Sequence, residues 1–346
     1  MKMHAYVAGI GMTRFGNHLT VKLKDLAAEA IREALMDSGL NARDIQAAYM
    51  GNASAGVIQG QEMIRGQAVL RAMGIGKIPV INIENACATS STAFNQAAAM
   101  ITFGAYDVVL VCGYEKLFHE DKKRSFLAFD GAVDTEDPEG MSGALKRLAA
   151  AAGETVDAET DDKSRSVFVD IYGYMTKAHM KNYGTTREQI AGVTAKNSRH
   201  GALNPRAQFQ KVVTVEDVLA AREIVWPLTL PMCSPIGDGA AAVMLVSERK
   251  AEAMGWAKKG RVMSSALVAG FEPDGHHHPV GAFAVAQAYE SAGIGPKDIN
   301  FAEVHDASAT SEIIAYEYLQ LCERGGGGKL IETGYTELGG KVPVNA

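Results

Sequence analysis

Cys87 is the residue best suited to covalent chemistry. It stands in the segment Asn85 to Thr92, where a short apolar strand gives way to an Ala-rich helix. At such a junction the backbone N–H groups and the helix dipole stabilise a thiolate and lower its pKa. A thiolate attacks a thioester readily, because the acyl-cysteine that forms is again a thioester. Cysteine is also common as a small buried hydrophobic residue, so the pattern alone leaves a nucleophile and a packing role equally open.

His305 is the second candidate for chemistry. It follows the apolar segment Phe301 to Val304, which predicts a buried strand. Open α/β sheets place their functional sites at the carboxyl ends of strands, and His305 would lie there. The alternative is a structural histidine capped by Asp306, and the residues alone favour that alternative.

The other cysteines and histidines do not predict a metal site. Cys112, Cys233 and Cys322 are far apart and form no CxxC pair, which argues against a zinc site and a disulfide framework. We interpret Cys112 and Cys233 as packing residues. The run His276 to His278 lies in a loop with Gly and Pro, which is more typical of solvated chain than of a metal site.

Composition and charge narrow the class of protein. The chain has 346 residues, 47% of them hydrophobic, which suits two similar lobes with a large buried core. The net charge is −6 with mixed signs, so no polybasic surface predicts binding to nucleic acid or to anionic lipid. The first residues turn polar too early for a signal peptide, and no run of 18 apolar residues occurs. We therefore expect a cytoplasmic protein with no membrane partner.

Hydrophobic patterning predicts an α/β fold. Strands and helices alternate in the first part of the chain, which implies a parallel or mixed sheet with helices on both faces. Residues 117–165 are charged and poorly periodic and read as an insertion, which the helices of 166–224 complete. The predicted strands are 5–10, 47–50, 78–83, 108–112 and 240–246, and the predicted helices include 25–36 and a segment ending near 101.

An internal repeat connects the two ends of the chain. Residues 28–55 and 282–309 are identical at ten of 28 positions, and both read as Ala-rich helix, Gly stop, acidic linker and strand. Lys77 to Val80 likewise resembles Lys341 to Val344. The alternative is that common helix and strand signals produce such matches. In the second copy the chain ends two residues later, so we expect a second lobe that stops inside a β-α unit. Either the sequence is cut short, which we favour, or another chain fills the gap.

The sequence resembles the thiolase superfamily, in its branch of archaeal acetyl-CoA acetyltransferases and sterol-carrier-protein-2 thiolases. The resemblance covers essentially the whole chain, and the segments IENACATSSTA and SPIGDGAAAVML are its most specific parts. It implies two lobes of like topology in five layers (αβαβα), with an inserted loop domain and an incomplete second lobe. The boundaries we expect are 1–116 and 225–258 for the first lobe, 117–224 for the inserted loop domain, and 259–346 for the truncated second lobe.

The resemblance also implies roles for the two candidates. Cys87 would be acylated by an acyl-CoA, with its backbone N–H in an oxyanion hole. His305, in EVHDASA, matches the histidine of a His-Asp-x-Phe motif that stabilises a thioester enolate, and this reverses our preference for a structural role. Family members continue with a Gly-His-Pro loop, absent from the 346 residues, whose histidine activates the nucleophile. Relatives with His-Asp-Cys-Phe use that Cys as acid/base, where this chain has Ala307 and Ser308.

Three classes of function follow. The first is a thiolase, an acetyl-CoA C-acyltransferase that cleaves 3-ketoacyl-CoA or condenses acyl-CoA through an acyl-cysteine. The second is a thiolase-like aldolase or lyase on a 3-hydroxyacyl-CoA, and the third is a non-catalytic acyl-CoA-binding subunit. Coenzyme A would be a substrate, with no permanently bound cofactor. The resemblance further implies a homodimer or homotetramer, and a small partner subunit with a zinc ribbon and an OB-fold.

Overall fold

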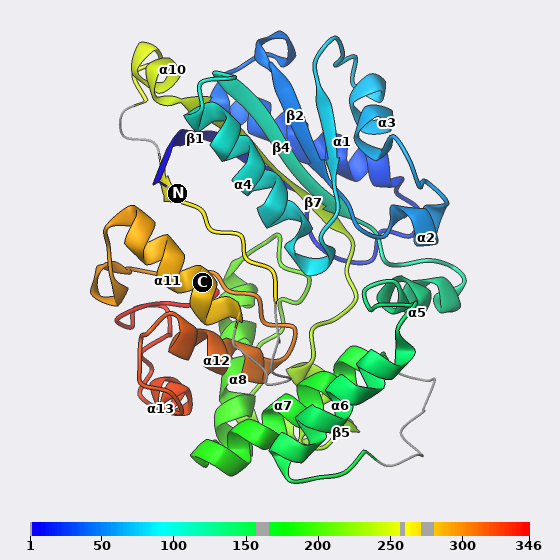
Figure 1. The fold of residues 1–346 in the computed structure, drawn as a ribbon, viewed down its shortest axis with the longest axis vertical. Helices are drawn as coiled ribbons and strands as arrows, with labels where there is room; N and C mark the ends of the chain where they lie inside the picture. The colour runs from blue at the N-terminus through cyan, green and yellow to red at the C-terminus, as the bar shows by residue number, and fades with distance from the viewer. Residues whose placement is uncertain (1, 157–165, 257–259, 271–279) are drawn as a thin grey trace. The chain divides into compact units, whose positions relative to one another are not determined.

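The computed structural model describes residues 2–156, 166–256, 260–270 and 280–346, so the run His276 to His278 lies outside the described residues. The chain divides into two compact units (Figure 1). Unit 1 comprises residues 1–128 and 236–293, and unit 2 comprises residues 129–235 and 294–346. These two units do not have the same boundaries as the four segments expected from the sequence. The expected domain boundaries remain a prediction.

Unit 1 is built on a six-stranded mixed sheet in the order β3-β2-β4-β7-β1-β8. β3, β2 and β4 run parallel, whereas β7 is antiparallel to β4 and β1, and β8 is antiparallel to β1. Every strand predicted in this part of the chain is confirmed, with ends shifted by a few residues. The strands are β1 (Lys2–Met12), β2 (Ala47–Gly51), β3 (Val80–Ile83), β4 (Val108–Glu115), β7 (Gly239–Ser247) and β8 (Arg261–Ser264).

Helices cover both faces of this sheet. α1 (Leu23–Ser38) buries Leu26 and Ile31 against one face, together with α3 (Arg65–Ala72) and α10 (Glu248–Ala253). α4 (Thr89–Thr102) packs its alanines and Ile101 against the other face. Because both faces are covered, β4 reads as a continuous apolar run rather than an alternating one. The unit also contains α2 (Ala55–Gln59), most of α5 (Lys122–Asp130) and α11 (Val280–Ala292), and the short 3₁₀ turns Ala42–Asp44 and Ala86–Ala88.

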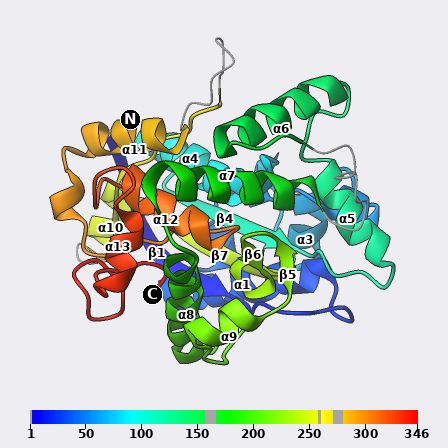
Figure 2. The same ribbon diagram turned by 90° about the horizontal axis from the view of Figure 1, so that it is seen from below.

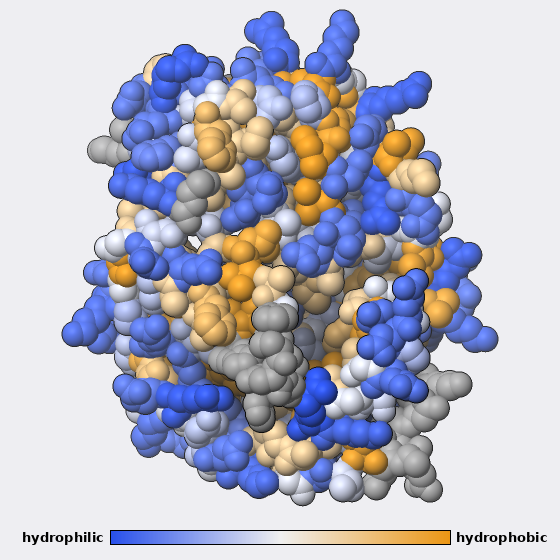
Figure 3. Space-filling view, viewed as in Figure 1, coloured by the Kyte–Doolittle hydropathy of each residue, from blue (hydrophilic) through white to orange (hydrophobic). Residues whose placement is uncertain are grey.

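Among the residues that the structure describes, β3 is an edge strand of this sheet and pairs only with β2. Its apolar side chains Val80, Ile81 and Ile83 are half-buried. Figure 3 shows hydrophobic residues gathered on the upper part of this face, near the labels of β2 and α1 in Figure 1. A strand edge with unpaired backbone groups and apolar side chains is suited to pairing with another chain.

Unit 2 is mostly helical. α12 (Ala309–Tyr318) lies beside α7 (Val167–Tyr183) and α8 (Arg187–Leu203), as Figure 2 shows. Its core joins Ile190 and Val193 of α8 to Ile313 of α12. The predicted helices in 166–224 are confirmed. The remaining elements are α6 (Pro138–Ala152), α9 (Val215–Ala220), β5 (Glu223–Val225), β6 (Leu228–Thr229), α13 (Gly327–Glu332) and the 3₁₀ turns Leu230–Met232 and Pro296–Asp298.

The internal repeat recurs in backbone detail. Gly39 and Gly293 both adopt the left-handed conformation after their helices, with φ of 66° and 70°. Each is followed by a 3₁₀ turn whose aspartate accepts a backbone N–H three residues earlier, at 2.8 Å in Asp44 and 2.9 Å in Asp298. The similarity of the two copies therefore extends to the turn geometry.

The strand pairing repeats as well. Ala48 pairs in parallel with Val80, and its N–H donates to the Pro79 carbonyl at 3.0 Å. Ala302 forms a parallel bridge with Val344, and its N–H donates to the Pro343 carbonyl, also at 3.0 Å. Ala48 and Ala302 are equivalent positions of the repeat, because they are separated by the same offset as the two glycines. The segments Lys77 to Val80 and Lys341 to Val344 therefore pair with equivalent positions in the two copies.

One expectation for the second part of the chain is wrong. Phe301 to Val304 does not form a buried strand: Ala302 has one isolated bridge, and Phe301 is 66% exposed. Within the described part of the chain the segment pairs with that single neighbour, and Phe301, Glu303 and His305 are exposed. The Gly run at 325–328 leads into α13, which begins at Gly327. A Cβ at Gly327 would lie 2.6 Å from the Ile313 carbonyl oxygen, so glycine permits close packing there.

None of the described helices is long and apolar enough to cross a membrane.

Gly11 allows α1 to approach β1, and its replacement tests that packing. A Cβ at Gly11 would lie 2.1 Å from the Ala30 carbonyl oxygen and 2.5 Å from the Ala34 nitrogen, both backbone atoms. We expect Gly11→Ala to lower the free energy of unfolding by about 1–3 kcal/mol, measured by urea denaturation. Gly16→Ala is the matched control, because nothing lies within 4 Å of its added Cβ. Equal effects of the two substitutions would contradict this packing.

Candidate active site

Cys87 lies in a strained turn between β3 and α4. Ala86 has a φ of 43°, a left-handed conformation that a residue with a Cβ seldom adopts. Residues 86–88 then form a 3₁₀ turn that leads directly into α4 at Thr89. Backbone strain of this kind costs about 1–3 kcal/mol and persists where surrounding contacts hold it. The turn therefore presents Cys87, which is exposed, at the start of a 14-residue helix.

Side-chain hydrogen bonds hold this turn. The Thr89 hydroxyl accepts from the Asn85 N–H at 2.8 Å and donates to the Ala86 carbonyl at 2.7 Å. The Asn85 side chain donates to the Thr92 hydroxyl at 2.9 Å, one helical turn further on. The Ala86 N–H donates to the Glu84 carboxylate at 2.7 Å. These bonds fix the backbone on both sides of Cys87 and explain how the strained Ala86 persists.

Two glycines seat the start of α4 on the sheet. Gly51 ends β2 and Gly113 lies near the end of β4, at the carboxyl edge that these parallel strands share. A Cβ at Gly113 would lie 2.0 Å from the Ser90 Oγ, and one at Gly51 would lie 3.1 Å from the Thr89 Cγ2. Because both lack a side chain, the first turn of α4 contacts the strand ends directly.

The other thiols are in less reactive surroundings. Cys112 is fully buried, and burial strongly raises the pKa of its thiol. Burial also raises the pKa of Cys233, whose side chain packs against the apolar core of unit 2 although its backbone bridges to Ser308. Burial and the nearby Glu317 raise the pKa of Cys322 to about 11. Of the four cysteines, only Cys87 is exposed.

His305 belongs to unit 2, whereas Cys87 belongs to unit 1. The surroundings of each residue are therefore described within its own unit. The imidazole is exposed, and Val304 and Asp306 on either side are half-buried. In the internal repeat, His305 corresponds to Gly51, the residue that ends β2 beneath the Cys87 turn. His305 therefore follows a segment with an isolated bridge at Ala302 in place of the buried strand expected from the sequence.

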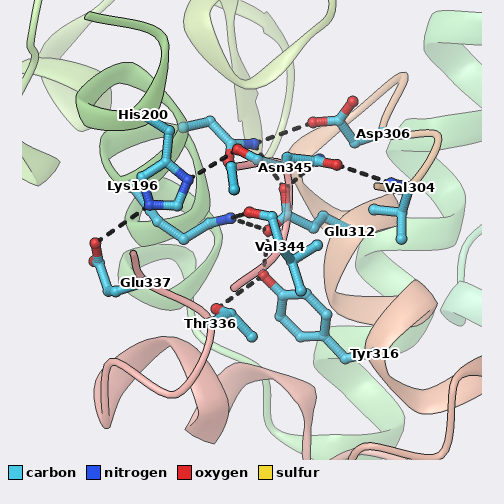
Figure 4. A network of polar contacts seen from close by, with 12 residues as sticks. Lys196, His200, Val304, Asp306, Glu312, Tyr316, Thr336, Glu337, Val344 and Asn345 are labelled. Atoms are coloured by element: carbon cyan, nitrogen blue, oxygen red, sulfur yellow. Dashed lines mark hydrogen bonds and ion pairs between the residues drawn. The ribbon is translucent and has the colours of Figure 1, made fainter. Parts of the chain in front are cut away.

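Glu312, in the same unit as His305, carries a carboxylate that is fully buried. One of its oxygens accepts from Lys196 Nζ at 2.7 Å and from the Tyr316 hydroxyl. The other accepts from Asn197 Nδ2 at 2.7 Å and from Asn345 Nδ2 at 3.0 Å. A carboxylate offers about four acceptor positions, and all of them are used here (Figure 4).

The charge on Glu312 is balanced by Lys196, which is 1% exposed and also donates to the Val344 carbonyl. A buried ion pair of this kind loses about 3–5 kcal/mol of stability when one partner is removed. Sequence reasoning missed this network, because lysine in a helix is normally solvated. The only sequence signal is the position of Lys196 on the apolar side of α8, between Val193 and His200, which are both buried.

Asn345 connects this network to the residue before His305. Its Oδ1 accepts from the Val304 N–H at 2.8 Å, and its own N–H donates to the Ala302 carbonyl at 2.9 Å. Its carbonyl accepts from His200 Nδ1 at 2.8 Å, while the Leu338 N–H donates to His200 Nε2. Asn345 adopts a left-handed φ of 52°, which asparagine tolerates better than most residues. Each of its polar groups is therefore engaged.

Asp306, the residue after His305, is held by Asn197, whose Nδ2 donates to its Oδ2 at 3.1 Å. Burial and the neighbouring Glu312 carboxylate raise the pKa of Asp306 to about 7. The group therefore exchanges its proton near neutral pH, next to the candidate histidine. The sequence indicated Asp306 only as a cap for His305.

Comparison with known proteins places this geometry in a family. The family model described as "Thiolase, N-terminal domain" matches residues 5–223, and "Thiolase C-terminal domain-like" matches residues 278–346. The chain belongs to the thiolase family. The predicted family and the thiolase fold are thus confirmed.

Relatives of this thiolase chain match along nearly its whole length. An acetyl-CoA acetyltransferase of Methanothermobacter thermautotrophicus is 33% identical over 98% of this chain and 83% of its own. The benzoylsuccinyl-CoA thiolase subunit BbsB of Thauera aromatica is 33% identical over 100% and 83%. Human sterol carrier protein 2 is 32% identical over 98% of this chain and 60% of its own.

Solved structures share the fold. The Ltp2-ChsH2(DUF35) aldolase has a TM-score of 0.77 at 24% identity, covering 99% of this chain and 84% of that one. Human mitochondrial 3-ketoacyl-CoA thiolase in complex with CoA has a TM-score of 0.65 at 15% identity, covering 96% and 92%. Among the described residues of this chain, no cluster of three or more His, Cys, Asp or Glu side chains is arranged to hold a metal ion.

The raised pKa of Asp306 gives stability a specific pH dependence. An unfolded aspartate loses its proton near pH ~3.9, whereas in the folded protein Asp306 keeps it up to about pH 7. Between these values the folded state binds more protons, so its stability falls as pH rises. Asn cannot titrate, so the thermal midpoint of Asp306→Asn relative to the wild type should rise from pH 4 to pH 8. Glu323→Gln removes an exposed carboxyl of the same unit, and an equal trend there would contradict the assignment.

Proposed function

We propose that this chain carries out thiolase chemistry on acyl-CoA, with Cys87 as the nucleophile. The observation that carries the proposal is the exposed Cys87 thiol, held by a strained turn at the start of α4 and above the carboxyl ends of parallel strands. Two relatives at 33% identity, named an acetyl-CoA acetyltransferase and a benzoylsuccinyl-CoA thiolase subunit, support the reaction class.

In the cleavage direction the Cys87 thiolate attacks the 3-keto carbonyl carbon of a 3-ketoacyl-CoA. The bond between C2 and C3 then breaks, and the electron pair moves into the enolate of acetyl-CoA, which takes up a proton and leaves. The acyl group remains on Cys87 as a thioester. A second CoA thiolate attacks this thioester and releases the shortened acyl-CoA, and the reverse sequence is a Claisen condensation.

His305 has the role of stabilising the enolate oxygen in this proposal. A donor placed where charge develops strengthens its interaction in the transition state, and losing one such donor costs about 10²–10³ in rate. The exposed position of His305 supports this role, as do the hydrogen bonds from half-buried Asn345 and Asn197 that hold the residues on either side of it.

A second candidate is a carbon–carbon lyase that acts on a 3-hydroxyacyl-CoA and needs no acyl-cysteine. Relatives with a second catalytic thiol carry a cysteine at the position of Ala307. Cys233 does not replace that thiol, because its side chain packs against the apolar core although its backbone bridges to Ser308. A non-catalytic acyl-CoA-binding subunit is the third class, and both alternatives are separated from the first by whether Cys87 becomes acylated.

The proposal includes coenzyme A thioesters as substrates and a homodimer or homotetramer as the assembly. The half-buried apolar edge strand β3 supports self-association, because it offers an unpaired strand edge. A solved relative in fold, named for a complex of Ltp2 with ChsH2(DUF35), motivates the proposal of a small partner subunit.

The direct test is intact mass spectrometry after incubation with acetyl-CoA. We expect a mass increase of one acetyl group that peptide mapping assigns to Cys87, and no increase in Cys87→Ala. Cys112→Ala is the matched control and should still be acetylated, because that thiol is buried. Cleavage of a 3-hydroxyacyl-CoA without any adduct would support the lyase instead, and an adduct on another cysteine would contradict the assignment.

A further inference from the structure

The residues on either side of His305 are tied to the same buried carboxylate by two asparagine side chains. Before His305, the Val304 N–H donates to Asn345 Oδ1, and Asn345 Nδ2 donates to Glu312. After His305, the Asp306 carboxylate accepts from Asn197 Nδ2, which also donates to Glu312. Both amides thus donate to the same Glu312 oxygen. Their other hydrogen bonds hold the residues directly before and after His305.

We propose that Asn197 and Asn345 are positioning residues for His305, acting by clamping residues 304 and 306 to the buried Glu312–Lys196 pair. This inference rests on the proposed role of His305 in the enolate-forming step. The clamp is rigid because its base is buried, with Glu312 and Lys196 at 0% and 1% exposure. Tyr316 reinforces the base from the next turn of α12.

Within the clamp, Asn197 is the residue that donates a hydrogen bond to Asp306. Its Nδ2 has two hydrogens, one for each carboxylate, so it holds Asp306 and Glu312 close together in spite of their like charge. Its Oδ1 is buried and accepts no hydrogen bond within the described part of the chain. Leaving a buried acceptor unused is costly, so the orientation of this amide is set by the two carboxylates.

The closing experiment replaces Asn197 with Asp, which keeps the shape but removes both donors and adds a charge. Asn182→Asp makes the same chemical change at an exposed position of α7 and serves as the matched control. The first measurement is hydrogen–deuterium exchange of residues 302–307, which needs no substrate. We expect faster exchange in Asn197→Asp, including at the Val304 N–H, and no change in Asn182→Asp.

The second measurement separates the two half-reactions. Deuterium incorporation at the α-carbon of acetyl-CoA in D₂O reports the enolate-forming step, and the mass adduct reports acylation of Cys87. We expect Asn197→Asp to slow deuterium incorporation by about 10- to 100-fold, because a displacement on the order of 1 Å has that effect, while acylation is retained. Asn197→Ala removes the donors without adding charge and gives the same readouts if the Asp variant fails to fold.

The outcomes distinguish the clamp from the function on which it rests. Unchanged exchange at 302–307 in both Asn197 variants overturns the clamp, whatever the activity. Equal losses in acylation and deuterium incorporation overturn the positioning role and leave a structural one. A wild-type protein with neither acylation nor deuterium incorporation would refute the proposed function, while the exchange measurement would still decide whether Asn197 holds the His305 segment.

Discussion

The first turn of α4 rests directly on the carboxyl ends of β2 and β4, because Gly51 and Gly113 carry no side chain there. Any larger residue at Gly113 would meet Ser90 and push the helix start away from the sheet. The left-handed Ala86 and the bonds from Thr89 follow from this contact, since the chain must turn sharply to leave β3 and enter the seated helix. The exposure of Cys87 at the helix start is the chemical consequence.

In unit 2 the corresponding constraint is electrostatic rather than steric. A carboxylate as deeply buried as Glu312 is stable only if its charge is paired and its oxygens accept hydrogen bonds. Lys196 supplies the charge, and Tyr316, Asn197 and Asn345 supply the remaining donors. The same saturation that makes Glu312 tolerable fixes the backbone around His305. The two candidate residues therefore stand on rigid supports of different physical kinds.

Much of unit 1 could be predicted because its elements obey local rules. The apolar run of β4, the periodic alanines of α1 and the Gly39 stop are each sufficient signals. The internal repeat could also be predicted as far as the Gly stop and the acidic linker with Asp298, whereas the turn in that linker is seen only in the structure. The buried strand at Phe301 was wrong, because strand formation depends on neighbours that local pattern does not reveal.

The candidate residues Cys87 and His305 came from local motifs and from resemblance, whereas their supports are long-range. Lys196 and Glu312 are more than a hundred positions apart in the sequence. Taken alone, each is a charged residue in a helix, which is normally exposed to solvent. Similarly, the contact of Gly113 with Ser90 depends on β4 lying beside β2. Such contacts follow from the folded sheet and not from any single segment.

The central claim is that the turn before α4 makes Cys87 a reactive thiolate, and the pH dependence of its alkylation tests this most directly. The rate of iodoacetamide modification at Cys87 is followed by peptide mass spectrometry across pH 5 to 10, with Cys87→Ala as the blank. The account predicts that Cys87 reacts before Cys112, Cys233 and Cys322, with a midpoint below the value of about 8.5 of an ordinary cysteine. A midpoint at or above that value, or faster modification of another thiol, would contradict it.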